Sequence, residues 1–373
     1  MDEFAILVNM SAILTKDCLM DTKVKPLPLK RKFIPHSILD DTEDDDLDEI
    51  LLMQRLMKKK DTKTEKSKSL VEQLSDGEIE TNFHMESSTL RELIQIISPV
   101  THLSASAISL GLWRLTTDEH YEQISRRFGV KLESCQKDIR SFWSEVAQNK
   151  RYFLKWPNSI EQRLILRKNR NNDIVSPLRG YFGGILLEQF DIFFECHNKE
   201  IPVVLQIVCD LKHRILDCFV DFASCYSFSN SPIGKRLEEE GLMDDAYLVG
   251  DRNFPLKEYL LTPFDKKQGK FNRSEKMWNS LVDRVDLHAK SVLYKMMKRF
   301  NTLYALETKD IEELKMICDT ICCIHNLCLD VSRERYGAEV FVQDKDFRID
   351  VDDRDIEGNL KRVRVVKEID IIL

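Results

Sequence analysis

Three closely spaced apolar runs constrain the fold of this chain more than any other feature. They cover residues 183–194, 201–209 and 214–222, and polar turns at 197–200 and 211–213 separate them. Apolar runs of this length joined by such short turns predict an antiparallel β-meander. The middle of the chain is therefore expected to form a sheet.

The segment after the meander predicts one more strand and two long helices. Residues 247–249 predict a short buried strand that stops at Gly250-Asp251. Residues 281–303 carry apolar side chains along one stripe, and residues 311–329 are apolar nearly all round, so the second helix is expected to be buried. Strands followed by helices predict an α+β domain over residues 178–332.

The segment before the sheet, residues 81–157, is expected to form an all-α domain. One amphipathic helix is predicted to run up to Pro99. Further along, a short helix to Arg127, a tight turn at 128–130 and a longer helix over 132–147 have the spacing of a helix-turn-helix.

Both ends of the chain are expected to be tails. Residues 1–80 are predicted to be largely disordered, with a short helix near 47–57, and residues 333–373 are predicted to be a C-terminal tail. The basic clusters at 23–25 and 30–32 fit either nuclear-import signals or a solvated tail.

Composition excludes several classes of protein. A hydrophobic content of 43% and a charged content of 32% fit a folded soluble protein, and no run of about 18 apolar residues predicts a membrane span. The N-terminus carries acids where a secretory signal has basic residues. Most of the ten cysteines stand inside apolar runs, which favours buried free thiols in a reducing compartment over disulfides.

The charge of the chain is unevenly distributed. The net charge is −7, yet residues 265–300 hold ten basic and four acidic residues, a local balance of +6. The second helix of the predicted helix-turn-helix, 131–147, has three basic residues against three acids and is electrostatically neutral. Each of these two segments fits either DNA contact or another role. The alternative is a solvated helix face for the first segment and a structural or protein-docking role for the second.

Several stretches together resemble one family, the PIF/Harbinger transposases and the host nuclease-like proteins derived from them. No stretch is decisive alone, but their order and spacing over residues 42–373 are specific. The stretches are Phe83-His84-Met85, GLWRLTTDEHYEQISRRFGV, LVGDRNFPLKEYLLTPF, Asn272, Arg299-Phe300, Cys323-Ile324-His325-Asn326 and EGNLKRVRVV.

This resemblance implies a ribonuclease H-like core with a DDE active site and a partner protein that has a Myb/SANT domain. A DDE site needs three carboxylates around two divalent metals such as Mg²⁺ or Mn²⁺, which activate water and stabilise the leaving oxygen. The positions that match the family triad are Leu186, Asp251 and Lys290, and the family's downstream histidine position is Gln189.

This triad predicts an inactive site that holds no metal. Leu186 offers no ligand, and Lys290 places a cation where a metal needs an anion. In a shifted alignment, Glu188 or Asp191 would replace the missing first acid and ligate metal with Asp251, but Lys290 would remain. Asp251 itself is interpreted as a remnant of the active site, with a turn-capping aspartate as the alternative.

His325 and the cysteines around it raise the possibility of a zinc site. Structural zinc sites bring ligand pairs from separate turns, whereas these residues share one apolar helix. A core helix is the better interpretation, with Asn326 satisfying a buried backbone group.

The sequence as a whole predicts a domesticated, catalytically inactive transposase in the nucleus, with the cytoplasm as a further location. It would act as a DNA- or chromatin-associated binding protein with a Myb/SANT-type partner. An active metal-dependent endonuclease and a protein scaffold without DNA affinity remain as alternatives. The residues expected to contact DNA are Arg126, Arg127, Lys131, Lys137, Arg140, Lys290, Lys295, Lys298 and Arg299.

Overall fold

The computed structural model describes residues 73–172, 175–265, 271–304, 306–332 and 355–372. The short helix expected near 47–57 and the basic clusters at 23–25 and 30–32 lie outside these residues. So do Lys266, Lys267 and Lys270 of the basic segment.

Helices make up the first part of the described chain. They are α3 (Asp76–Phe83), α4 (Ser87–Thr101), α5 (Ala105–Thr116), α6 (Tyr121–Phe128) and α7 (Leu132–Gln148). The helical part begins five residues before the expected boundary at 81, because Ser75 and Glu78 form a capping box that starts α3 at Asp76. Helix α4 contains Pro99 in its last turn and continues to Thr101.

Helices α6 and α7 agree closely with the two helices predicted for this segment. Gly129 ends α6 with a φ of +63°, a left-handed conformation that glycine adopts without steric cost. Residue 111 in α5 is also a glycine for a packing reason, since a Cβ there would lie 2.1 Å from the Phe142 ring of α7. Helices α5 and α7 therefore pack at close range.

The sheet confirms the predicted meander and the α+β class. Its strands are β1 (Tyr181–Phe194), β2 (Lys199–Cys209), β3 (Ile215–Phe222), β4 (Tyr247–Gly250), β5 (Leu260–Leu261) and β6 (Glu307–Thr308). The order is β3-β2-β1-β4-β5, and β6 pairs with β1. Strands β1, β2 and β3 are antiparallel, whereas β4 runs parallel to β1 and β5 parallel to β4.

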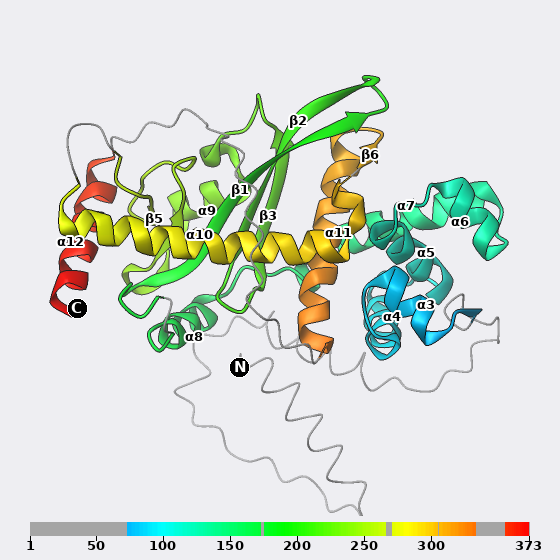
Figure 1. The fold of residues 1–373 in the computed structure, drawn as a ribbon, viewed down its shortest axis with the longest axis horizontal. Coiled ribbons are helices and arrows are strands. Elements are labelled where there is room, and N and C mark those ends of the chain that lie inside the picture. The colour runs from blue at the N-terminus through cyan, green and yellow to red at the C-terminus, as the bar shows by residue number, and fades with distance from the viewer. Residues whose placement is uncertain (1–72, 173–174, 266–270, 305, 333–354, 373) are drawn as a thin grey trace, which may run out of the picture. The chain divides into compact units, whose positions relative to one another are not determined.

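Helices cover both faces of the sheet (Figure 1). On one face, α8 (Ser159–Asn169) and α9 (Pro232–Glu240) pack against Phe182, Ile185 and Leu187 of β1. On the other face lie α10 (Arg273–Arg299) and α11 (Ile311–Val331), which bury Leu186 and Phe194 of β1. Alternate residues of β1 thus face opposite layers, as strand geometry requires. Short 3-10 turns occur at Lys150–Tyr152, Phe228–Asn230, Met243–Asp245 and Asn301–Tyr304.

The expected C-terminal tail is corrected over residues 356–372, which form helix α12 (Ile356–Ile372). Its residues Val365, Val366 and Ile369 pack against α10 and the end of the sheet in one apolar cluster. Its Lys361 donates to the Ala246 carbonyl, and Arg362 donates to the carbonyls of Thr262 and Pro263. Charged side chains with apolar stems can pack in this way, so a charged segment still forms part of the core.

Within the part of the chain that the structure describes, no single helix is long and apolar enough to cross a membrane. Helices α4 and α5 together reach the required length and composition, with a bend of 116° between them.

Candidate functional site

Strands β1 and β4 bring two of the triad positions together. In their parallel register Gly184 is paired with Val249 and Ile185 with Gly250. Leu186 and Asp251 follow directly after these pairs, on neighbouring strands. The two residues that the sequence matched to the first and second acids of the family therefore lie side by side, at the end of β4.

Asp251 is held by the turn that follows β4. Its Oδ1 accepts from the backbone N of Asn253 at 2.9 Å, and its Oδ2 accepts from Asn253 Nδ2, also at 2.9 Å. Burial raises the pKa of Asp251 to about 6, and the charge of Asp286 adds to the rise, while the bonds from Asn253 and the charge of Lys290 oppose it. The turn-capping role and the position in the family triad thus both apply to Asp251.

Helix α10 carries Lys290, the residue that the sequence matched to the third acid of the family. It lies close over β1, where a Cβ on Gly184 would be 3.2 Å from Val285 and 3.5 Å from Ala289. From this helix Lys290 Nζ forms an ion pair with Asp286 Oδ2 at 3.0 Å. Both groups act on the charge of Asp251, Lys290 favouring its ionised form and Asp286 opposing it.

Asp286 is a site residue that the sequence analysis missed. It stands four residues before Lys290, and such i,i+4 pairs of opposite charge share one face of a helix. That spacing is the signal that would have placed Asp286 beside the third triad position.

Leu186 belongs to the apolar core and adds no oxygen to this site. Its side chain is 2% exposed and packs in the cluster that includes Ala289 and Val292 of α10. The position matched to the first acid is therefore closed by hydrocarbon.

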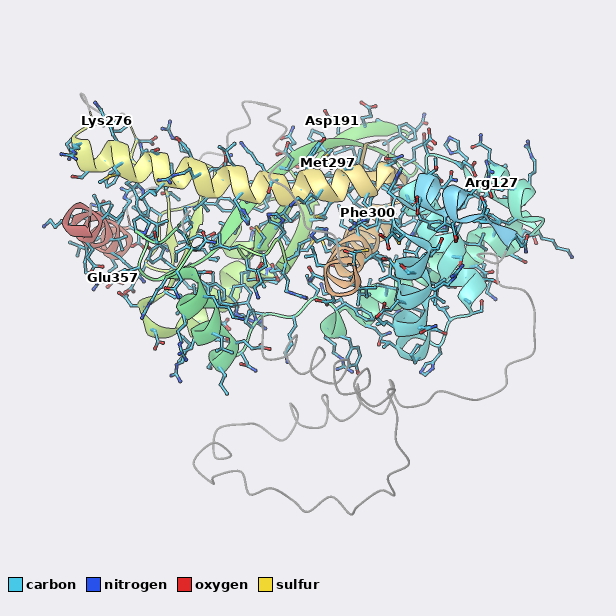
Figure 2. All side chains as sticks on the ribbon, turned by 60° about the horizontal axis from the view of Figure 1, so that its bottom comes forward. Arg127, Asp191, Lys276, Met297, Phe300 and Glu357 are labelled. Carbon is cyan, nitrogen blue, oxygen red and sulfur yellow. The ribbon has the colours of Figure 1, made fainter. Side chains whose placement is uncertain are left out.

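The two acids considered as replacements for Leu186 lie elsewhere on β1. Asp191 is exposed on the outer part of the β1–β2 hairpin (Figure 2), roughly 16 Å along the strand from Leu186, and alternation turns it to the opposite face. Glu188 shares the face of Leu186 and is half-buried, two residues further from Gly184 along the strand. The structure therefore does not bring Asp191 to Asp251.

These residues do not fit a pair of divalent metals. Two metals need at least three anionic oxygen ligands that converge, whereas this site has Asp251 and Asp286 with an ammonium group between the helix and the strand. Among the described residues, no group of three or more histidine, cysteine or acidic side chains is arranged to hold a metal ion.

Many of the basic residues expected to contact DNA make contacts within the protein. Arg127 pairs with Glu119 and lies over the Trp113 ring, and Arg140 pairs with Glu313. Lys295 bonds to the His213 ring, and Arg299 is buried. Together with Lys290, these side chains help to hold the fold.

The remaining basic candidates are exposed. Arg126 lies on α6, Lys131 directly before α7, Lys137 on α7, and Lys298 near the end of α10. In Figure 2 the label Arg127 marks the helical part and the label Met297 marks α10. Arg127 and Arg140 are exposed as well, although both form ion pairs.

The Cys-Ile-His-Asn stretch is part of a core helix, as expected, and it anchors the β2–β3 hairpin. Asn326 Oδ1 accepts from the backbone N of Ile215 at 2.9 Å, and its Nδ2 donates to the carbonyls of Ile215 and Phe153. His325 Nε2 contacts the His213 carbonyl at 2.9 Å. The prediction that Asn326 satisfies buried backbone groups is confirmed.

The strand order and the facing helix define the class of protein. A meander, then a parallel strand followed directly by Asp251, and a long helix that carries Lys290 form the arrangement expected of a ribonuclease H-like DDE core.

Comparison with known proteins agrees with this class. Residues 186–326 match the family described as DDE superfamily endonuclease. The chain is 23% identical over 266 residues to "Protein ALP1-like" of Arabidopsis thaliana, an alignment that covers 64% of this chain and 64% of that protein, less than two-thirds of its length. No solved structure matches the chain. These matches support a likeness of residues 186–326 to DDE superfamily endonucleases and of the chain to a transposase-derived protein family.

Proposed function

We propose that this protein is a domesticated transposase that has lost DNA cleavage and acts by binding, in the nucleus, to DNA or chromatin. The observation that carries the first part is the ion pair between Lys290 and Asp286 beside Asp251. A lysine ammonium at the third triad position repels a divalent metal, and the apolar Leu186 gives it no ligand. Metal-assisted attack on a phosphodiester therefore lacks its ligand set.

Cleavage assays test this loss of activity. The full-length protein is incubated with supercoiled and linear duplex DNA in Mg²⁺ or Mn²⁺, next to the Asp251→Ala variant. We expect equal and background-level cleavage from both proteins. Metal-dependent cleavage that disappears in Asp251→Ala would instead establish the alternative function, an active endonuclease of the DDE class.

The second part, DNA binding, is supported by the exposed basic residues on two elements. Lys137 lies on α7 and Lys298 lies on α10. Both helices carry other basic residues, and the described part of α10 has more basic than acidic residues. Contacts between lysine and phosphate release counter-ions, so affinity should fall with salt, with a slope of about 0.9 per phosphate contact.

Charge reversal separates a DNA binder from a scaffold. We expect Lys137→Glu and Lys298→Glu each to weaken binding to duplex DNA several-fold and to reduce the salt slope by about one contact. The matched control is Lys235→Glu, the same charge change on an exposed residue of α9, which covers the opposite face of the sheet from α10. Binding that is absent, or equally weakened by all three variants, favours a scaffold without specific DNA affinity.

The partner and the compartment follow from the family resemblance. Transposases of this kind work with a Myb/SANT-type protein, so we propose such a partner and a nuclear location for this chain. Imaging of the tagged full-length protein, with affinity purification from nuclear extract and mass spectrometry, tests both. A cytoplasmic protein that recovers no Myb/SANT-domain protein would overturn this part of the proposal.

A further inference from the structure

The chain contains four steps in which a serine or threonine directly precedes a proline, and all four lie among the described residues. They are Ser98-Pro99, Ser176-Pro177, Ser231-Pro232 and Thr262-Pro263. Such a step is the core of the substrate of proline-directed protein kinases, which transfer the γ-phosphoryl group of ATP to the hydroxyl. The hydroxyl has to enter the active site of the kinase, so its position in the fold decides which step can be a substrate.

Three of the four hydroxyls are held inside the fold. Ser98 lies in α4, where its Oγ donates to the Leu103 carbonyl at 2.7 Å. Ser231 is fully buried, and its Oγ caps α9 by accepting from the backbone N of Gly234. Thr262 is 2% exposed and directly follows β5. A kinase therefore reaches none of these three hydroxyls in the folded protein.

Ser176 lies on the surface, in the turn between α8 and β1. It is exposed, and its hydroxyl forms no hydrogen bond with another residue in the described part of the chain. Its backbone N donates to the Asn172 carbonyl at 2.7 Å, and the backbone N of Leu178 donates to the Val175 carbonyl at 2.7 Å. Val175 and Leu178 are buried in one cluster with residues of α10 and α12. The turn is therefore anchored on both sides of an exposed serine.

The third residue after each serine or threonine gives a second criterion, which is independent of burial. Cyclin-dependent kinases favour a basic residue at this position, because charge contacts help a kinase to select its substrate. Arg179 occupies it for Ser176, and Arg179 is exposed and has no ion pair within the described residues. The corresponding residues of the other three steps are Thr101, Gly234 and Asp265. Exposure and charge thus select the same serine.

We propose that Ser176 is a phosphorylation site for a proline-directed kinase of the cyclin-dependent class. The Ser176 Oγ attacks the γ-phosphorus of ATP, the bond from that phosphorus to the β–γ bridging oxygen breaks, and ADP leaves. The catalytic aspartate of the kinase takes up the hydroxyl proton. This inference goes beyond the proposed function, since it depends neither on the loss of cleavage nor on DNA binding.

Phosphorylation would change the charge of the surface around this turn. Residues 167–179 hold four basic residues and one acid, a balance of +3. A phosphoserine carries about −1.5 to −2 charges at pH 7, so the balance would fall to about +1. Because Val175 and Leu178 anchor the turn in the core, the phosphate is added to a surface that is already folded. A kinase thereby sets the charge of this surface.

The experiment incubates the full-length native protein with an active cyclin-dependent kinase and ATP, next to the variants Ser176→Ala and Arg179→Gln. Intact-protein mass spectrometry counts the phosphates, and peptide mass spectrometry locates them. We expect one phosphate, at Ser176, in the native protein and none in Ser176→Ala. Arg179→Gln should be phosphorylated at least about tenfold more slowly, since it loses a charged contact with the kinase. The matched control Ser98→Ala should be phosphorylated like the native protein.

A synthetic peptide of residues 171–184 separates recognition of the sequence from access in the fold. We expect the kinase to phosphorylate both this peptide and the folded protein. Phosphorylation of the peptide alone would show that the turn hides Ser176, and phosphorylation of neither, by a kinase active on a standard substrate, would show that the pattern is not recognised. Phosphate that stays in Ser176→Ala would place the modification elsewhere. Each of these three results overturns the inference and leaves the proposed function unchanged.

Discussion

Three histidines beside Lys295 are held in their neutral form at the β2–β3 turn. The His213 and His288 rings lie 4.6 Å apart, Lys295 Nζ contacts the His213 ring, and His325 Nε2 contacts the His213 carbonyl. Burial lowers the pKa of His213 to about 3, helped by the charges of His288, Lys295 and His325. Burial also lowers the pKa of His325 to about 4 and lowers that of His288.

These lowered pKa values predict acid destabilisation in a defined range. The unfolded chain takes up protons on His213 and His325 near pH 6.5, whereas the folded chain does so only near pH 3 for His213 and near pH 4 for His325. Between these values the unfolded state binds more protons, so stability is complete above pH 6.5 and falls as the pH drops. The free energy of unfolding falls by about 1.4 kcal/mol per histidine for each pH unit.

His213→Asn tests this assignment, because asparagine tolerates the left-handed φ of +64° at this position. Urea unfolding from pH 7.5 to 4.5 should show a drop in the free energy of unfolding that is smaller by about 1.4 kcal/mol per pH unit in the variant. His102→Asn is the matched control, since His102 is exposed and also has a left-handed φ, +57°. Identical pH profiles for His213→Asn and the native protein would contradict the prediction.

At the scale of elements, the stretches that identify the family mainly hold helices in place. Asn272 caps α10 by accepting from the backbone N of Glu275 at 2.8 Å. Asn326 of α11 anchors β3, and the C-terminal stretch forms α12. The Trp278 indole of α10 donates to the Thr262 carbonyl at 3.0 Å, which ties the Thr-Pro stretch to that helix. The resemblance therefore lies largely in residues that hold the scaffold, whereas only Asp251 of the three matched triad positions is an acid.

Gly358 allows α12 to approach the core, and its replacement should release this helix. A Cβ at this position would lie 2.7 Å from the carbonyl carbon of Lys257. We expect Gly358→Ala to lower stability by about 1–3 kcal/mol and to speed hydrogen exchange over residues 356–369. In the control Gly77→Ala no atom lies within 4 Å of the new Cβ, so the exchange of α12 should be unchanged. Normal protection of α12 in Gly358→Ala would refute this packing role.

The elements that the sequence predicted are those with long apolar periods. The meander, α7 and α11 each repeat an apolar pattern over many residues, which local spacing can detect. Strands β5 and β6 have two residues each, and only their pairing with β4 and β1 makes them strands. Helix α12 was missed because its buried face includes Lys361 and Arg362, whose partners are carbonyls distant in the sequence.

For the candidate site, the sequence offered residue assignments that stay predictions, and it revealed few of the contacts that the structure shows. The resemblance assigned Leu186, Asp251 and Lys290, and the β1–β4 register with α10 brings these positions together. The sequence could not reveal that Arg140 pairs with Glu313 or that Lys295 meets His213, because those partners are far away along the chain. Charge counting alone therefore overstated the basic surface.

At the scale of the whole described molecule, α11 joins the helical part to the sheet. Arg140 Nε contacts Glu313 at 3.1 Å, Lys150 Nζ contacts Asp319 at 3.0 Å, and Thr320 bonds to the Trp143 carbonyl. The opposite side of α11 packs on β3, and one apolar cluster includes residues of α4, α5, α7, α11 and the sheet. Figure 1 shows α11 (orange) between these two regions.

Because one core serves both regions, the helical part and the sheet, as far as the structure describes them, should unfold together. Ile321 of α11 is fully buried in this shared cluster. Ile321→Ala should lower the free energy of unfolding by about 2–5 kcal/mol, since it removes buried methyl groups and leaves a cavity. In native-state hydrogen exchange, amides of α5 and of β2 should lose protection by the same amount, because the mutation acts on a single cooperative transition.

The exposed Ile160→Ala on α8 is the control and should change both regions little. If Ile321→Ala weakened protection in α5 while β2 stayed fully protected, the helical part and the sheet would be separate folding units. Charge changes on α7 and α10 would then have to be interpreted as acting on independent domains.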